Sequence, residues 1–138
     1  MATAHPFDAT WPAVPDSVRA ARRSVVAHLS ALRTSDPPLS DIGLAVSEAV
    51  TNAVHHAYVG QEPGPVHVRV VTRPPEIEVM VQDEGSGMMP RADSPGLGLG
   101  MPLIATISER FDVRTRPGGG TRLCIWFSLD PEDATLQD

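Results

Sequence analysis

Three polar side chains with different chemistry recur at helical spacing in the segment 47–58. Glu48, Asn52 and His56 stand at positions i, i+4 and i+8, so on an α-helix they lie along one ridge. A carboxylate can act as a general base, an amide oxygen can bind a hard cation, and an imidazole can form hydrogen bonds. An ordinary solvated helix flank has the same pattern, so the ridge alone does not establish a site.

The ridge borders a broad apolar stripe that must face a core. The stripe consists of Ile42, Val46, Ala49, Val50, Ala53, Val54 and Ala57. This periodicity predicts a helix that begins after the break Ser35–Pro38 and ends around Tyr58–Gly60.

The first of three glycine-rich segments, Asp83–Gly87, directly follows the predicted strand Glu76–Gln82. A carboxylate at a strand end can accept a hydrogen bond from an amine such as the exocyclic amine of adenine. Neighbouring glycines allow the backbone to approach a flat ring. A solvated turn would explain the segment equally well if it stood alone.

The second and third glycine-rich segments come before a helix and a strand. Gly96–Gly100 precedes a helix that runs to Ile107, and glycines there expose backbone N–H groups to an anion such as phosphate. Gly118–Thr121 precedes the last strand, where Thr121 could hold a water molecule or an adenine ring nitrogen. The alternatives are a flexible hinge for the second segment and a simple hairpin turn for the third.

The remaining periodicities define the architecture that must position these groups. We expect a helix over 18–32 and strands over 7–11, 66–70, 76–82, 111–116 and 121–129. Because the strands are apolar on one side only, they predict an α+β fold: a two-layer sandwich with about three helices on one face of a mixed four- to five-stranded sheet. We expect one domain over residues 1–138, with loose ends at 1–6 and 131–138.

Composition excludes several classes of function. All 11 basic residues are arginines, which excludes a P-loop lysine and a Schiff-base lysine. The net charge of −6 argues against a general nucleic-acid binder.

We see no signal peptide and no apolar run long enough to span a membrane, so we expect a cytoplasmic protein. The single cysteine, Cys124, is expected to pack in a strand, and the adjacent His55 and His56 diverge too far on a helix to share one metal ion.

The order of these motifs resembles the GHKL ATPase superfamily, with its gyrase, chaperone and histidine-kinase members. The match covers Ser47 to Phe127. Within it, the stretch Ser47–Ala53 followed by His56 and Tyr58 is similar to the bacterial anti-sigma-factor serine/threonine kinases. The resemblance implies the histidine-kinase-like ATPase fold, with ATP and Mg²⁺ as cofactors.

The resemblance also implies roles for individual residues. Asn52 would bind Mg²⁺ and Glu48 would be the general base toward a substrate hydroxyl. Asp83 would receive the adenine amine, assisted by Thr121. The segments that would line the base and the phosphates contribute Gly85, Gly87, Gly96, Leu97, Gly98, Leu99 and Gly100. Arg91 is the only basic residue between Arg73 and Arg110. If a cation from the loop between Asp83 and Gly100 meets the γ-phosphate, it would therefore be Arg91.

Two classes of function follow from the resemblance. The first is an ATP-dependent protein serine/threonine kinase that phosphorylates an anti-anti-sigma (STAS-type) partner, sequesters a sigma factor, or does both. The alternative is a non-catalytic regulatory module that holds ATP or ADP and sequesters a protein partner, and a weaker option is a scaffold that binds no nucleotide. A homodimer formed through residues 7–33 is compatible with each, and no direct contact with nucleic acid or membrane is expected.

Overall fold

The computed structural model describes residues 6–32, 38–85 and 100–129. The elements along the chain are β1 (Phe7–Pro12), α1 (Pro15–Ala31), α2 (Leu39–Asn52), the π-helical turn η1 (Ala53–Ala57), β2 (Pro65–Arg73), β3 (Glu76–Asp83), α3 (Gly100–Ile107), β4 (Arg110–Thr115) and β5 (Thr121–Ser128). Among these residues, no helix is both long enough and apolar enough to cross a lipid bilayer.

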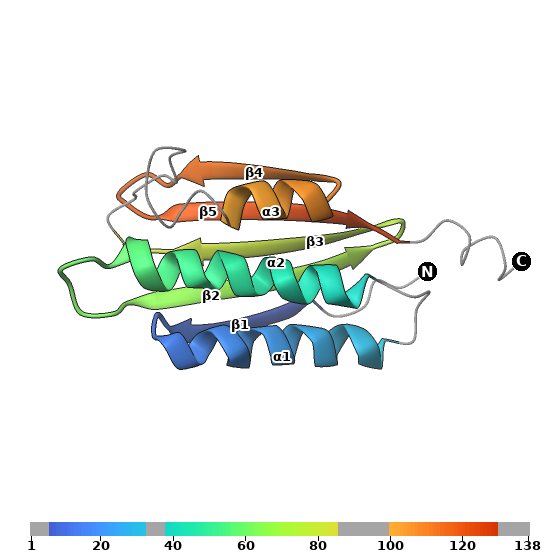
Figure 1. The fold of residues 1–138 in the computed structure, drawn as a ribbon, viewed down its shortest axis with the longest axis horizontal. Coiled ribbons are helices and arrows are strands. Elements are labelled where there is room, and N and C mark those ends of the chain that lie inside the picture. The colour runs from blue at the N-terminus through green and yellow to red at the C-terminus, as the bar shows by residue number, and fades with distance from the viewer. Residues whose placement is uncertain (1–5, 33–37, 86–99, 130–138) are drawn as a thin grey trace, which may run out of the picture.

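The five strands form one sheet in the order β1-β2-β3-β5-β4. All three α-helices lie on the same face of this sheet, as Figure 1 shows. The predicted two-layer α+β sandwich is therefore confirmed. The sheet is antiparallel at every pairing rather than mixed. The pairs β2–β3 and β4–β5 are each joined by a tight turn, which requires antiparallel strands, and β1 and β3 also pair antiparallel with β2 and β5.

The core lies between the helices and the covered face of the sheet. Strand residues alternate in burial, as in β2, where Val66, Val68 and Val70 are fully buried and the residues between them are not. The largest fully buried side chains come from α1, α2, α3 and three strands, β2, β3 and β5: Phe127, Leu29, Ile42, Ile77, Ile104, Ile125, Val25, Val46, Val50, Val66, Val68 and Val70. This continuous apolar layer holds α2 against the central strands.

The helix predicted to run to Tyr58 changes its winding at Ala53. Up to Asn52 it is α-helical, and the following turn, Ala53–Ala57, is π-helical. Single π turns within helices occur frequently at functional sites. Here the turn ends at Ala57, whose carbonyl oxygen lies against Gly85 at the end of β3.

Candidate functional site

Five chain segments meet at one end of the sandwich: the end of α2 with η1, the end of β3, the start of α3, β4 and the start of β5 (Figure 1). A cavity of about 40 Å³ opens between them. It is lined by Ala49, Asn52, Ala53, His56, Ala57, Val81, Asp83, Met101, Val113, Thr121 and Leu123. Three residues predicted from separate motifs, Asn52, Asp83 and Thr121, therefore share one cavity.

The other predicted site residues are distributed around this cavity or fall outside the description. Glu48 is half-buried one helical turn before Asn52 and is not among the lining residues. Gly85 follows Asp83 closely, and Gly100 begins α3, next to the lining residue Met101. Six predicted residues lie outside the described part of the chain: Gly87, Arg91, Gly96, Leu97, Gly98 and Leu99.

The volume of the cavity agrees with its being lined by only part of the predicted site residues. A space of about 40 Å³ holds a few water molecules and is too small for a nucleotide. The described residues thus supply the floor of a candidate nucleotide site, on which the base and the cation would rest.

The carboxylate of Asp83 is held from two sides at the end of β3. Its Oδ1 accepts the backbone N–H of Gly85 at 3.1 Å and that of Thr121 at 3.3 Å. Both donors use the same oxygen, and within the described residues Oδ2 has no hydrogen-bond donor. An oxygen fixed in place and left without a donor is suited to accept an amine of a bound ligand.

The surroundings of Asp83 perturb its ionisation in opposing directions. Burial raises the pKa of its carboxyl above the ordinary value of 3.8. The N–H groups of Gly85 and Thr121 and the charge of Arg116 favour the carboxylate and oppose this shift. A raised pKa in a carboxyl group that lines a cavity is typical of a functional site.

Two glycines allow three backbone segments to touch beneath the cavity. A Cβ on Gly85 would lie 1.9 Å from the carbonyl oxygen of Ala57, and a Cβ on Gly120 would lie 2.3 Å from that of Asp83. Gly120 also has a φ of +106°, which L side chains rarely adopt. The glycine patterns in this region therefore serve close backbone approach as well as any contact with ligand.

Asn52 brings an unpaired polar group into the cavity. Its Nδ2 is buried and has no hydrogen-bond partner among the described residues. Because buried polar atoms are almost always paired, a side chain of this kind fits a bound partner. A rotation of the amide exchanges its nitrogen and oxygen, so Asn52 can also present an oxygen to a cation.

The chemistry of the donor set fits Mg²⁺ better than a transition metal. In the described part of the chain, no three His, Cys, Asp or Glu side chains gather closely enough to hold an ion by themselves. Mg²⁺ commonly keeps several waters and relies on one or two protein oxygens together with substrate phosphates. One amide oxygen from Asn52 meets that modest requirement.

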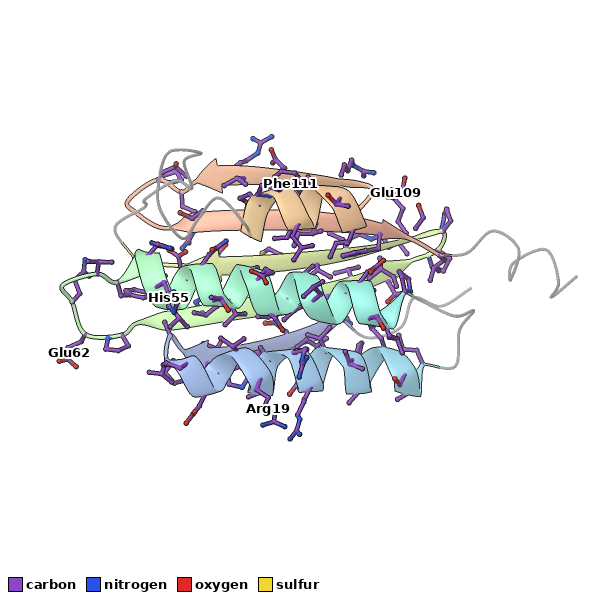
Figure 2. The ribbon with its side chains drawn as sticks, viewed as in Figure 1. Arg19, His55, Glu62, Glu109 and Phe111 are labelled. Carbon is purple, nitrogen blue, oxygen red and sulfur yellow. The ribbon has the colours of Figure 1, made fainter. Side chains whose placement is uncertain are left out.

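Residues that the sequence motifs did not single out as ligand-binding also border the site. His56 lines the cavity, and burial, with a smaller effect of His55, lowers its pKa, so the imidazole is neutral near pH 7. The neighbouring His55 is exposed at the same end of the helix (Figure 2). Arg116 donates from Nη1 to the carbonyl oxygen of Asp83 at 3.5 Å. Its position follows from the pairing of β4 with β5, which no local pattern around Arg116 reveals.

The comparison with protein families agrees with this geometry. Residues 11–127 match the family model described as the histidine kinase-like ATPase domain. This match spans most of the chain, from β1 to β5. The chain therefore belongs to the histidine-kinase-like ATPase family.

Individual relatives narrow the class further. An anti-sigma F factor of Clostridium novyi (strain NT) is 32% identical over 116 residues, which cover 76% of this chain and 81% of the relative. An anti-sigma F factor of Clostridium kluyveri (strain NBRC 12016) is 35% identical over the same length and coverage. The serine-protein kinase RsbW of Listeria monocytogenes serovar 1/2a is 37% identical over 87 residues, 62% of this chain and 55% of the relative. The predicted anti-sigma-factor kinase branch is confirmed.

Solved structures confirm the fold. The structure of the RsbU and RsbW domains of Rv1364c from Mycobacterium tuberculosis superimposes with a TM-score of 0.69 at 21% identity. It covers 91% of this chain, which spans 33% of the length of that solved chain. The SiaB-SiaC complex from Pseudomonas aeruginosa gives a TM-score of 0.56 at 14% identity, with coverage of 91% and 89%.

Proposed function

We propose that this protein is an ATP-dependent serine/threonine kinase that phosphorylates an anti-anti-sigma partner of the STAS type, sequesters a sigma factor, or does both. The observation that carries the proposal is the meeting of Asn52, Asp83 and Thr121 in one cavity, with Glu48 one turn away on the same helix. The anti-sigma F factors and the RsbW kinase among its relatives support the choice of substrate and partner. Such partners imply that the protein acts in the cytoplasm.

In this proposal the nucleotide base rests against the end of β3. Asp83 accepts the exocyclic amine of adenine on Oδ2, while its Oδ1 stays bound to the N–H groups of Gly85 and Thr121. Thr121 lies opposite Asp83 in the register of β3 and β5 and can assist through a water molecule. The resemblance adds that the N–H groups of Gly96–Gly100, which precede the rest of α3 in the sequence, would bind the phosphates, that Gly87 would line the base and that Arg91 would meet the γ-phosphate.

The two polar residues of α2 serve the transfer itself. Asn52 holds Mg²⁺, which neutralises charge on the phosphates when it is bound. Glu48 accepts the proton of the partner's serine hydroxyl. The half-exposed position of Glu48 outside the cavity suits this role, because a base that meets a second protein must be reachable from solvent.

The test is phosphotransfer from labelled ATP to a cognate STAS-type partner in the presence of Mg²⁺. Glu48→Gln keeps the shape of the side chain and removes the base, so we expect a loss of roughly 10²- to 10⁴-fold in rate with nucleotide binding retained. Glu62→Gln is the matched control, because Glu62 is exposed in the loop after η1 (Figure 2). Undiminished transfer by the Glu48 variant, or none by the wild type, would overturn the kinase proposal.

The second candidate is a non-catalytic regulatory module that binds ATP or ADP and sequesters a protein partner. The scarcity of cations favours it: Arg91 is the only basic residue between Arg73 and Arg110, whereas phosphoryl transfer requires charge neutralisation at the phosphates. The same assay separates the two candidates, since the module would bind its partner tightly in a nucleotide-dependent way and transfer no phosphate. Dimerisation through residues 7–33 stays a prediction under both.

A further inference from the structure

The hydroxyl of Tyr58 joins three segments next to the candidate adenine pocket. It donates a hydrogen bond to the carbonyl oxygen of Pro65 at 2.7 Å and accepts the backbone N–H of Glu84 at 2.8 Å. Tyr58 itself follows η1, Pro65 begins β2, and Glu84 is the first residue after β3. One hydroxyl thus connects the helix that carries Asn52 to the strand end that carries Asp83.

The N–H of Glu84 has no strand partner to replace this hydroxyl. The pairing of β3 with both of its neighbours ends at Asp83, opposite Val66 on one side and Thr121 on the other. A backbone N–H in this half-buried position requires an acceptor, and the Tyr58 hydroxyl supplies it. The N–H of the peptide unit between Asp83 and Glu84 is therefore held by the side chain of Tyr58, while its carbonyl oxygen accepts from Arg116 Nη1.

The aromatic ring of Tyr58 is held tightly enough to make this contact specific. Tyr58 is buried, and a Cβ on Gly64 would lie only 2.5 Å from its Cε1 atom. Burial raises the pKa of the phenol, which keeps the hydroxyl protonated and able to donate to Pro65. The hydroxyl therefore has a fixed position and a fixed direction of donation.

We infer that Tyr58 is a positioning residue for base recognition: through the N–H of Glu84 it fixes the backbone that aims Asp83 Oδ2 at the adenine amine. The inference rests on the proposed role of Asp83 as the adenine acceptor. It adds that α2 and η1 act on the base as well as on the phosphate end of the nucleotide, since Tyr58 directly follows η1, which continues the helix of Asn52 and Glu48.

The test compares the affinities of ATP and purine riboside triphosphate, which lacks the 6-amino group, by calorimetry on the full chain with Mg²⁺. The wild type is expected to favour ATP by about tenfold or more, because the amine donates to a carboxylate. Tyr58→Phe retains the ring and removes only the hydroxyl, so we expect this preference to shrink by about three- to tenfold. A purely structural role would weaken both nucleotides equally and leave their ratio unchanged.

Two further variants sharpen the measurement. Ser108→Ala removes a hydroxyl that donates to the carbonyl oxygen of Ile104 at 2.6 Å, beyond the end of α3, and should leave the ratio unchanged. Combining Tyr58→Phe with Asp83→Asn should reduce the ratio no further than Asp83→Asn alone, because both changes act on the same acceptor.

A second readout does not depend on any variant. Tyr58 is the only tyrosine in the chain, so 3-fluorotyrosine labels this position alone. Its ¹⁹F resonance should shift more on binding ATP than on binding purine riboside triphosphate, and equal shifts would overturn the inference.

The outcomes distinguish this inference from the proposed function. A wild type that discriminates by the amine while Tyr58→Phe retains the full ratio overturns the role of Tyr58 and leaves the adenine site intact. A wild type that does not discriminate overturns the assignment of Asp83 and with it the role of Tyr58.

Discussion

The two faces of the sheet have the same strands and different chemistry. Toward the helices, β3 presents Ile77, Val79 and Val81, which are almost fully buried, and then Asp83 at the rim of the cavity. On the opposite face the strands present exposed or half-exposed charged pairs. These are Arg110–Glu76, Arg114–Asp112, Arg73–Glu78, Arg69–Asp8 and His67–Glu84.

This difference shows where stability and function are located. Burial of apolar surface dominates folding free energy, whereas solvated ion pairs contribute little because water screens them. Asp83 is a charged group placed at the edge of the buried face, where its ionisation is perturbed, and its neighbour Glu84 points to the solvated face and binds His67. Substitutions of adjacent residues that point to opposite faces should therefore differ sharply in their effects on stability and on ligand binding.

The largest expected difference is between two adjacent aromatic residues of β5. Phe127 is 1% exposed on the covered face, and Trp126 lies on the other face with the guanidinium carbon of Arg110 4.5 Å from its ring centre. Phe127→Ala should lower the free energy of unfolding by about 3–5 kcal/mol through lost burial and a new cavity. Trp126→Ala should lower it by about 1 kcal/mol. Denaturant unfolding of both variants measures this, and equal losses would contradict the assignment of the faces.

The next prediction concerns the turn between β4 and β5. Gly118 and Gly120 both have positive φ angles, of +84° and +106°, but a Cβ would meet only open space at Gly118 and the Asp83 carbonyl oxygen at Gly120. Alanine at either position carries the backbone strain, and at Gly120 the clash adds about 1–3 kcal/mol. Gly120→Ala should also weaken ATP binding by moving Asp83. Thermal unfolding and calorimetry test this pair, and identical behaviour of the two variants would count against the close contact.

The perturbed pKa of Asp83 predicts two opposite pH dependences. Its folded pKa is raised above 3.8, so the folded chain binds this proton more tightly than the unfolded chain. The contribution of Asp83 to stability is therefore greatest at low pH and is lost as the pH rises through the folded pKa. ATP affinity should change the other way, because the adenine amine needs the carboxylate. Asp83→Asn should abolish both dependences in paired titrations of stability and affinity, and their persistence in that variant would assign them to other groups.

The smallest effect is expected from the ion pair between Arg110 and Glu76 on the solvated face. Arg110 Nη1 lies 2.7 Å from Glu76 Oε2, and this hydrogen bond lowers the pKa of the Glu76 carboxyl. Because both side chains are exposed, Glu76→Gln should change stability only slightly, and the change should vanish in concentrated salt. A large, salt-independent loss in denaturant unfolding would show that this face supports the fold more than its exposure indicates.

Local periodicity predicted most of the fold, and it predicted the site only in part. The alternation of Ile77, Val79 and Val81 defined β3 and placed Asp83 at its end, and the stripe on α2 placed Asn52 beside the core. The antiparallel pairing throughout, the π-helical turn and the contact of Arg116 with Asp83 depend on residues distant in sequence, so no local pattern carried them. The roles of Glu48 and the glycine-rich segment 96–100 stay predictions.

The most direct test of the account compares two neighbouring carboxylates that point to opposite faces of the sheet. Asp83→Asn and Glu84→Gln make the same chemical change, from a carboxylate to an amide, at each position. Calorimetry measures the affinity of both variants for Mg²⁺·ATP. We predict that Asp83→Asn weakens binding by about tenfold or more, because an amide replaces the acceptor of the adenine amine, while Glu84→Gln binds like the wild type. Equal affinities for the two variants would contradict the placement of the adenine site at the end of β3.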